Sequence, residues 1–288
     1  MNTPRATISK ILTFSCVDGP GNRLVLFMQG CNFACLACHN PHTMGVCDHC
    51  GKCVPVCHKH ALSVVDGRVV FDPSQCDQCD ECLRACPINA NPMVREYDVA
   101  EVLAIARDNL PFIDGITVSG GEATMQLKFV TALFEAVKAN PELSRLSCMI
   151  DSNGYLGPKS WEKVLPVTDG VMLDVKAMNP ATHCFLTTAD NARVLASARL
   201  LQEAGKLTEV RFLVIPGYTD KPDEIAAFKA FLDELGGDVR VRVNAFQHHG
   251  VIGPALDWPK ATREIVDAVA GEIRAAGVGE VATPEVYV

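Results

Sequence analysis

The sequence predicts an α/β fold, a partial (β/α)6 barrel, and three features of its 288 residues lead to it. Short apolar runs alternate with segments of helical periodicity, which is typical of parallel strands covered by helices. The runs are almost continuously hydrophobic, as expected for strands buried on both faces. Several end in glycine or polar residues, and in barrel-like α/β folds the functional site gathers at the carboxyl ends of the strands. Six such units indicate an open, TIM-like barrel and not a closed eight-fold one.

The elements follow from this alternation in chain order. Strands are expected at residues 24–30, 115–121, 146–154, 170–177, 210–217 and 241–246. Helices are expected at 99–110, 127–140, 192–205 and 222–236, where apolar residues recur at helical spacing.

A cysteine-rich stretch interrupts the pattern, so three segments are expected. Residues 1–45 hold the first strand and the loop after it, residues 46–95 are an insert, and residues 96–288 complete the barrel. Inside the insert we expect a hairpin at 61–73, with Asp66-Gly67 as its turn.

The composition excludes several classes of protein. With 48% hydrophobic and 21% charged residues, the chain is an ordinary globular one. A net charge of −8 argues against nucleic-acid binding, which usually needs a basic surface. No apolar run reaches 18 residues, so we expect no membrane span, and the N-terminal residues lack a secretory h-region. The expected compartment is the cytoplasm, where 14 cysteines indicate metal binding and not disulfides.

Eight of these cysteines form an internal repeat in the insert. Two runs with the spacing C-x2-C-x2-C-x3-C lie 29 residues apart, which is the ferredoxin pattern, and in that pattern the fourth cysteine of each run binds the cluster of the other run. We therefore expect two [4Fe–4S] clusters, with a pair of structural zinc sites as the alternative. The first run ends in Cys57-His58, where the pattern prefers Cys-Pro. The expected ligands are Cys47, Cys50, Cys53 and Cys86 for cluster I, and Cys57, Cys76, Cys79 and Cys82 for cluster II.

Three further cysteines, Cys31, Cys35 and Cys38, follow the first predicted strand in the segment CNFACLACHN. Three thiolates on a cubane leave one iron without a protein ligand, and a small molecule can bind that iron through an amine and a carboxylate. A zinc ion held by three loop thiols is the alternative. The spacing C-x3-C-x2-C resembles the signature of the radical S-adenosylmethionine (SAM) superfamily. The resemblance implies that SAM chelates the open iron, and that one electron then cleaves its C5′–S bond to give a 5′-deoxyadenosyl radical.

The same resemblance assigns SAM contacts to the strand ends. The GGE motif meets the SAM amino group, an Asp-x-Lys segment contacts SAM, and an Arg in the 210–217 strand neighbours it. Ala37 stands where the superfamily commonly has an aromatic residue, so stacking on the adenine falls to His39 or Phe33. Relatives often carry a histidine that contacts the adenine at the position of Gln247, and here His248 and His249 are its neighbours. The implied SAM contacts are Ala37, Cys38, His39, Gly120, Gly121, Glu122, Ser152, Asp174, Val175, Lys176, Arg211, Gln247 and His249.

Two more assignments rest on this resemblance. A monovalent cation beside the SAM carboxylate is expected at Asp151, Ser152, Met172 and Asp174. The residues expected to take part in the chemistry are the three loop cysteines, Lys176 and Asp18.

At the level of the whole chain, the sequence resembles the glycyl radical enzyme-activating enzymes, and is closest to the YjjW-type activases with a ferredoxin-like insert. The residues that carry this resemblance are FSCVDGPGNRLVLFMQGCN, CHNP, the insert, SGGE, DSNG and RFLVIPG. It implies removal of a hydrogen atom from the Cα of one glycine in a partner glycyl radical enzyme, with Asp18 touching the incoming glycine loop.

The resemblance also implies reduced ferredoxin or flavodoxin as electron donor, with the insert clusters as a relay; a structural or docking role is the alternative for the insert. Two rival functions are a peptide-modifying radical SAM maturase and a non-catalytic electron carrier. Maturases usually place auxiliary cysteines near the C-terminus, where this chain has none after Cys184. A carrier would leave the three-cysteine loop unexplained.

Overall fold

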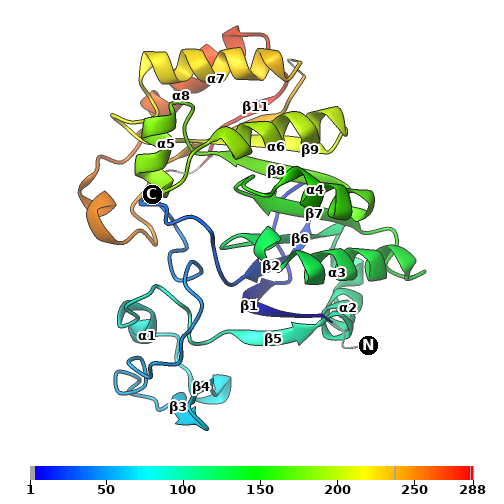
Figure 1. Cartoon of the computed structure of the whole chain (residues 1–288), viewed down its shortest axis with the longest axis vertical. Coiled ribbons are helices and arrows are strands. Elements are labelled where there is room, and N and C mark those ends of the chain that lie inside the picture. Colours follow the sequence, from blue (N-terminus) through cyan, green and yellow to red (C-terminus); the bar gives the residue numbers. More distant parts are fainter. Residues whose placement is uncertain (1–3, 237, 286, 288) are drawn as a thin grey trace. The chain divides into compact units, whose positions relative to one another are not determined.

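The structure is a computed structural model that describes residues 4–236, 238–285 and 287. Internal contacts divide the chain into two compact units (Figure 1). Unit 1 comprises Met1–Asn32 and Asn40–Ser147, and unit 2 comprises Phe33–His39 and Cys148–Val288. The cysteine loop is therefore shared: Cys31 belongs to unit 1, whereas Cys35 and Cys38 belong to unit 2.

Unit 1 contains a four-stranded sheet in the order β5-β1-β2-β6. β2 and β6 are parallel, whereas β1 is antiparallel to both of its neighbours. The two parallel strands are almost completely buried, which matches their continuous apolar sequences. The bounds are β1 Arg5–Leu12, β2 Arg23–Met28, β5 Arg95–Asp98 and β6 Gly115–Gly120.

Two helices of unit 1 pack against each other, α2 (Val99–Asp108) and α3 (Leu127–Ala139) (Figure 1). A capping box starts α2, because the Asp98 carboxylate accepts from the backbone N–H of Glu101 and the Glu101 side chain accepts from the N–H of Asp98. α3 buries an apolar stripe that includes Phe129, Leu133 and Val137, as its periodicity predicts. The short 3-10 helices η2 (Leu110–Phe112) and η3 (Ala123–Gln126) precede β6 and α3.

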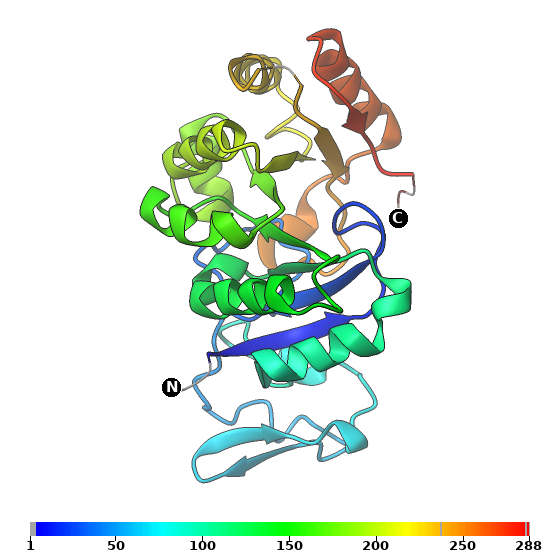
Figure 2. The ribbon, with the colours of Figure 1, turned by 90° about the vertical axis from the view of Figure 1, so that its right-hand side faces the viewer.

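The insert has little regular structure, as expected for a segment organised by metal ligands. It holds the hairpin β3 (Leu62–Val65) and β4 (Arg68–Phe71), η1 (Pro73–Gln75) and the short α1 (Glu81–Arg84). Asp66 and Gly67 both have positive φ, 49° and 73°, so they form the predicted tight turn. Figure 2 shows the hairpin projecting from the rest of unit 1.

Unit 2 is a parallel sheet in the order β7-β8-β9-β10-β11. The strands are β7 Ser147–Ser152, β8 Gly170–Val175, β9 Leu207–Val214, β10 Val241–Ala245 and β11 Val281–Ala282. The helices are α4 Pro158–Val164, α5 Pro180–Thr187, α6 Ala192–Glu203, α7 Pro222–Glu234 and α8 Arg263–Ala275, with η4 Leu165–Val167 and η5 Gly253–Asp257. Prolines at the starts of α4, α5 and α7 suit the first helical turn, which needs no backbone donor there.

All six predicted strands are present, as β2, β6, β7, β8, β9 and β10, and the four predicted helices are α2, α3, α6 and α7. β1 and β5, which form the antiparallel edge of unit 1, were not predicted. Nor were α4, α5, α8 and β11. None of the helices in the described part of the chain has the length and apolar character needed to cross a membrane.

Candidate functional site

One group of candidate site residues lies in unit 1, where β2 and β6 end side by side. Met28 pairs with Gly120 in the parallel register, so both strands reach their carboxyl ends together. Beyond them the Gly121 N–H donates to Met28 O at 2.9 Å, and the Glu122 N–H donates to Gly30 O at 2.8 Å. The GGE motif is therefore bonded to the residues immediately before Cys31.

Close backbone approach explains the two glycines. Gly120 has a φ of +115°, which side-chain-bearing residues rarely adopt. A Cβ on Gly121 would lie 2.3 Å from Gly30 O and 2.5 Å from Thr43 O. The two glycines thus allow the backbone of the motif to pack closely in unit 1, independently of any contact with a ligand.

Glu122 is almost completely buried, with 1% of its surface exposed. Its Oε1 accepts from the backbone N–H of Thr124 at 2.9 Å and from the Thr124 hydroxyl at 2.5 Å, which caps η3.

We expect Gly121→Ala to lower the free energy of unfolding by about 1–3 kcal/mol, because the new methyl group would overpack against two carbonyl oxygens. Gly271→Ala in α8 is the control, since a Cβ there meets nothing within 4 Å. Removing a helix-interior glycine should add about 0.5–1 kcal/mol. Anaerobic urea unfolding of both variants measures the two effects, and equal stabilities would contradict the close packing of Gly121.

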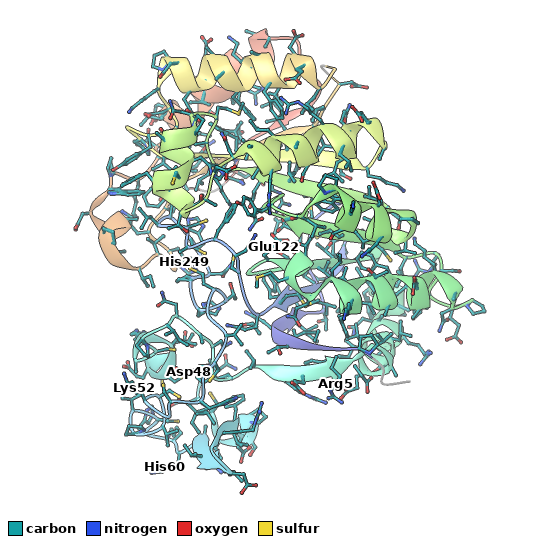
Figure 3. All side chains as sticks on the ribbon, in the orientation of Figure 1. Arg5, Asp48, Lys52, His60, Glu122 and His249 are labelled. Atoms are coloured by element: carbon teal, nitrogen blue, oxygen red, sulfur yellow. The ribbon has the colours of Figure 1, made fainter. Side chains whose placement is uncertain are left out.

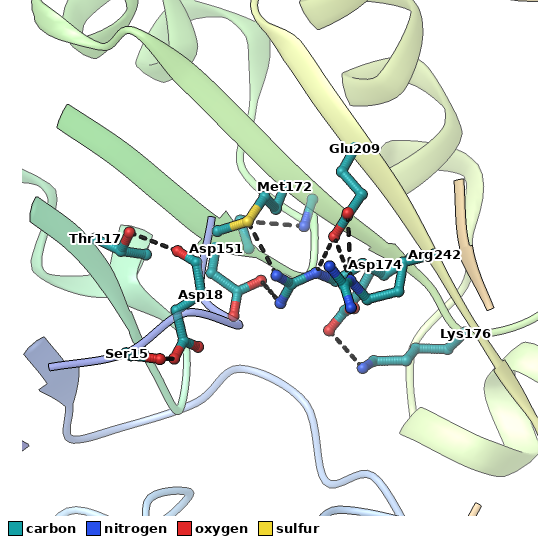
Figure 4. Close-up of polar contacts among 12 residues, drawn as sticks. Ser15, Asp18, Thr117, Asp151, Met172, Asp174, Lys176, Glu209 and Arg242 are labelled. Carbon is teal, nitrogen blue, oxygen red and sulfur yellow. Dashed lines mark hydrogen bonds and ion pairs between the residues drawn. The ribbon is translucent and has the colours of Figure 1, made fainter. Parts of the chain in front are cut away.

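Asp18 lies in the DGPG turn of unit 1. Its carboxylate accepts from the Ser15 hydroxyl at 2.5 Å, and its backbone carbonyl accepts from the Thr117 hydroxyl at 2.7 Å (Figure 4). Gly21, with a φ of +71°, closes the turn against Asp114. The side chain of Asp18 is therefore held in place and half-buried, whereas the neighbouring Phe14 and Val17 are exposed.

In unit 2, the residues 33–39 of the cysteine loop are fastened to the end of α5. The Ala34 N–H donates to Thr187 O at 3.0 Å, and the Leu36 N–H donates to Leu186 O at 2.9 Å. Phe33 is buried, with its ring edge-on to those of Tyr155 and His183. Phe33 therefore anchors the loop in the unit 2 core and is not exposed for stacking on a ligand.

Lys176 lies at the end of β8, close to two of the loop cysteines. Its ammonium donates to Asp174 Oδ2 at 2.6 Å. Burial by itself lowers the pKa of Lys176, but Asp174 and the sulfurs of Cys35 and Cys38 outweigh burial and hold the pKa above its ordinary value. The structure thus places a fixed positive charge beside the two thiols.

Arg211, on β9, is the centre of a buried ion-pair network, and its partners Asp151, Met172 and Glu209 are labelled in Figure 4. Its guanidinium lies 3.2 Å from Asp151 Oδ1 and 2.8 Å from Glu209 Oε1, and it contacts the sulfur of Met172 at 2.9 Å. Burial opposes the charge, but Asp151, Asp174 and Glu209 raise the pKa of Arg211. The predicted cation site overlaps this network: Asp151 is paired with Arg211 and Asp174 with Lys176.

Glu209 was not among the predicted site residues. It is 4% exposed and binds Arg211, Arg240 and Arg242. Its role could have been predicted from the sequence, because Glu209 and Arg211 are two residues apart and therefore lie on the same face of β9. An acidic residue inside an apolar strand needs a cationic partner.

Gln247, His248 and His249 were all considered as adenine contacts, and their side chains differ in what they contact. The side chain of Gln247 donates to Ala261 O at 2.9 Å, and the His248 ring lies 2.8 Å from Trp258 O. Both side chains are therefore used inside unit 2, whereas His249 is exposed. A Cβ on Gly250 would lie 2.0 Å from His39 O, so this turn packs directly on the cysteine loop.

His39 contacts the same turn. Burial lowers its pKa first, followed by the charge of Lys176, while a hydrogen bond to the Gln247 backbone acts in the opposite direction. Its Nε2 is buried and has no hydrogen-bond partner among the described residues. A neutral ring with one unpaired nitrogen is suited to receive a polar group from a ligand.

The eight cysteines of the insert divide between two cavities. One cavity is lined by Cys47, Cys50, Cys53 and Cys86 among others. The other is lined by Cys57, Cys76, Cys79 and Cys82 among others. In both cases the fourth cysteine comes from the other run, which is the crossed arrangement expected for two cubanes.

The backbone of the insert repeats as its sequence does. Positive φ angles occur at His49 and Gln78, at Gly51 and Asp80, and at His60 and Asn89, each pair 29 residues apart. The His49 N–H points at Cys47 Sγ at 3.4 Å, and the Gln78 N–H at Cys76 Sγ at 3.3 Å. Such N–H···S bonds stabilise thiolates that bind iron.

Burial and neighbouring thiols raise the pKa of one cysteine of the insert. Burial, then the nearby Cys53 and Cys57, raises the pKa of the Cys82 thiol to about 11. A metal bound at this thiol would offset that cost, because it would remove the proton and neutralise the charge.

His58 stands where the ferredoxin pattern prefers proline, and its ring lies 2.9 Å from Asp77 and 3.9 Å from Cys79 Sγ. Asp48 and Lys52 flank the first cavity (Figure 3).

Of the other three cysteines, Cys148 is buried, whereas Cys16 and Cys184 are exposed.

Comparison with known proteins identifies the family. Residues 25–228, well over half of the chain, match the family model described as the radical SAM superfamily. The chain belongs to the radical SAM superfamily. Superfamily membership implies a [4Fe–4S] cluster and SAM as cofactors.

Curated relatives narrow the class to activating enzymes. The chain is 31% identical to a pyruvate formate-lyase-activating enzyme of Streptococcus mutans, over 83% of this chain and 76% of that protein. It is 32% identical to an isethionate sulfite-lyase activating enzyme of Nitratidesulfovibrio vulgaris, over 78% of this chain and 80% of that protein. This radical SAM chain is thus an enzyme related to the activases of glycyl radical enzymes.

Solved structures support the fold. A radical SAM methyltransferase from Sphaerobacter thermophilus matches 99% of this chain and 78% of its own with a TM-score of 0.59 at 14% identity. QueE from Escherichia coli matches 97% and 94% with a TM-score of 0.55 at 12% identity. The predicted partial barrel of radical SAM type is confirmed by these matches.

Proposed function

We propose that this radical SAM enzyme activates a glycyl radical enzyme by removing a hydrogen atom from the Cα of one glycine in that partner. The observation that carries the proposal is the set of curated relatives: three are activating enzymes of three different lyases, at 30–32% identity over 78–83% of this chain. The DGPG turn adds support, because Asp18 is held half-buried beside the exposed Phe14 and Val17, where a partner loop can reach it.

Cys31, Cys35 and Cys38 are the proposed ligands of the SAM cluster, which leaves one iron open to SAM. Bound there, the cluster and SAM together supply a 5′-deoxyadenosyl radical, because one electron from a reduced donor cleaves the C5′–S bond and releases methionine. Two features of unit 2 fit an anionic cluster: the Lys176 ammonium close to Cys35 and Cys38, and the hydrogen bonds that fasten their loop to α5.

Residues of both units are proposed to hold SAM. In unit 1, the carboxylate of Glu122 provides a partner for the SAM amino group, and Gly120 and Gly121 contribute backbone. In unit 2, Lys176 and Arg211 provide cations for the SAM carboxylate, beside Asp174, Val175 and Ser152. For the adenine we propose His39, whose Nε2 is buried without a partner among the described residues, and the exposed His249. A monovalent cation at Asp151, Ser152, Met172 and Asp174 stays a prediction.

The insert, residues 46–95, is proposed to carry two further [4Fe–4S] clusters that pass electrons from reduced ferredoxin or flavodoxin. The two cavities support the crossed ligand sets. The positive φ angles that recur 29 residues apart support two sites with similar backbone geometry. Thiolate clusters persist in a reducing compartment, so the proposed location is the cytoplasm.

Two assays test this function. Anaerobically reconstituted enzyme should convert SAM to 5′-deoxyadenosine with dithionite, which a simple electron carrier would not do. Incubated with its partner glycyl radical enzyme, it should then produce the EPR doublet of a glycyl radical on that partner. Cleavage of SAM without a doublet, together with modification of a peptide, would favour a maturase and overturn the proposal.

A further inference from the structure

A short hydrogen-bonded path leaves the insert at Cys86, a proposed ligand of cluster I. The Ala90 N–H points at Cys86 Sγ at 3.3 Å. The carbonyl of the same peptide group, Asn89 O, accepts from the Gly45 N–H at 3.1 Å. One peptide group thus connects the Cys86 sulfur with the segment that precedes the insert.

The next peptide group completes the connection to the SAM-cluster loop. Its nitrogen is that of Gly45, and its carbonyl, Met44 O, accepts from the Cys31 N–H at 2.9 Å. Only two peptide groups, three hydrogen bonds and the Cys31 side chain therefore separate the sulfurs of Cys86 and Cys31. Every atom of the path lies in unit 1.

The surrounding contacts fix this path. A Cβ on Gly45 would lie 2.1 Å from Ile88 O, so the two segments touch through their backbones. Thr43 and Ala90 form an antiparallel bridge, and the Gln29 side chain donates to Gly45 O at 2.6 Å. The path is thus fixed by several contacts, with Ala90 buried and the other residues of the path partly exposed.

The chain after Cys57 makes a contact that stays inside the insert. The peptide group His60–Ala61 is the repeat counterpart of Asn89–Ala90, since Ala61 follows Cys57 as Ala90 follows Cys86. The next carbonyl, Ala61 O, accepts from the Asp72 N–H at 2.8 Å, at the base of the hairpin.

We propose that cluster I, and not cluster II, is the member of the insert pair coupled to the SAM cluster, through Cys86, Ala90, Gly45 and Cys31. This inference rests on the proposed function. The electron comes from the reduced ferredoxin or flavodoxin, which loses one electron, and it is consumed in cleaving the sulfonium of SAM to methionine and the 5′-deoxyadenosyl radical.

Matched double variants test the coupling. Cys79→Ala with Cys82→Ala removes two ligands of cluster II, and Cys50→Ala with Cys53→Ala removes the equivalent pair of cluster I. Each reconstituted full-length protein is reduced with dithionite, and the SAM cluster is recognised as the EPR signal that shifts when SAM is added. We expect that signal to be broadened and fast-relaxing in the variant that keeps cluster I, and to lose this spin coupling in the variant that keeps cluster II.

Equal coupling in the two variants, or coupling only in the one that keeps cluster II, would overturn the inference. The measurement does not need SAM to be cleaved. Enzyme that produces no 5′-deoxyadenosine would therefore defeat the proposed function and leave the coupling result standing.

A second pair of variants keeps every cysteine and so guards against loss of folding. Ala90→Pro removes the N–H that points at Cys86, and Ala61→Pro is its repeat-matched control, because the preceding residues Asn89 and His60 have nearly equal φ angles, 53° and 54°. With wild-type iron content in both, freeze-quench EPR after photoreduction should show slower filling of the SAM cluster in Ala90→Pro only. A wild-type rate in Ala90→Pro would contradict the path.

Discussion

Cys35→Ala abolishes the formation of 5′-deoxyadenosine, because the SAM cluster then keeps only two of its three thiolates. Residues 33–39 are fastened by backbone bonds to Leu186 and Thr187, so the substitution should not displace the loop itself. The measurement is 5′-deoxyadenosine per enzyme under anaerobic conditions with dithionite, and the expected product is at the level of an enzyme-free blank.

Cys184→Ala is the control for this variant. Cys184 is an exposed free thiol on α5, the helix that holds the loop, but it has no role in the proposed site. It should retain the wild-type yield. Full activity of Cys35→Ala would remove Cys35 from the ligand set and with it the three-thiol cluster.

Arg211→Met lowers the free energy of unfolding by about 3–5 kcal/mol, because it removes a cation from a buried ion-pair network. Asp151 and Glu209 lose this cation, and their side chains are 16% and 5% exposed, although Glu209 keeps its contacts with Arg240 and Arg242. Urea unfolding of the reconstituted protein, followed by circular dichroism, measures the loss.

Arg107→Met provides the comparison for an exposed ion pair. Arg107 lies 2.9 Å from Glu142, but both side chains are at least half exposed. Such pairs contribute below about 1 kcal/mol, so this variant should unfold almost as wild type does. If Arg211→Met were equally mild, the network around Glu209 would not be a buried structural unit.

The parallel strands could be predicted because each is apolar along its whole length and is followed by a helix. β1 and β5 could not, since they pair antiparallel with each other at an edge, and their residues are half exposed and alternate in character. α5 was missed because one proline and two threonines in its eight residues obscure the helical period, although it holds the cysteine loop through Leu186 and Thr187.

The grouping of the insert cysteines around two cavities was predictable because their spacing is local in sequence. The ion pair of Lys176 with Asp174 is also local, because the two residues are two positions apart at the end of β8. The ion pair of Arg211 on β9 with Asp151 on β7 was not predictable, because it depends on the order of the strands in the sheet. Phe33 was weighed as a stacking residue, whereas burial against His183 and Tyr155 makes it a loop anchor.

Mössbauer spectroscopy of enzyme enriched in iron-57 and kept free of oxygen tests the central claim most directly, because it observes the iron that the three thiols of Cys31, Cys35 and Cys38 leave open. We predict that adding SAM changes the isomer shift of one distinct iron site of a [4Fe–4S] cluster, and that Cys35→Ala lacks this site. Spectra that are identical with and without SAM would contradict the account.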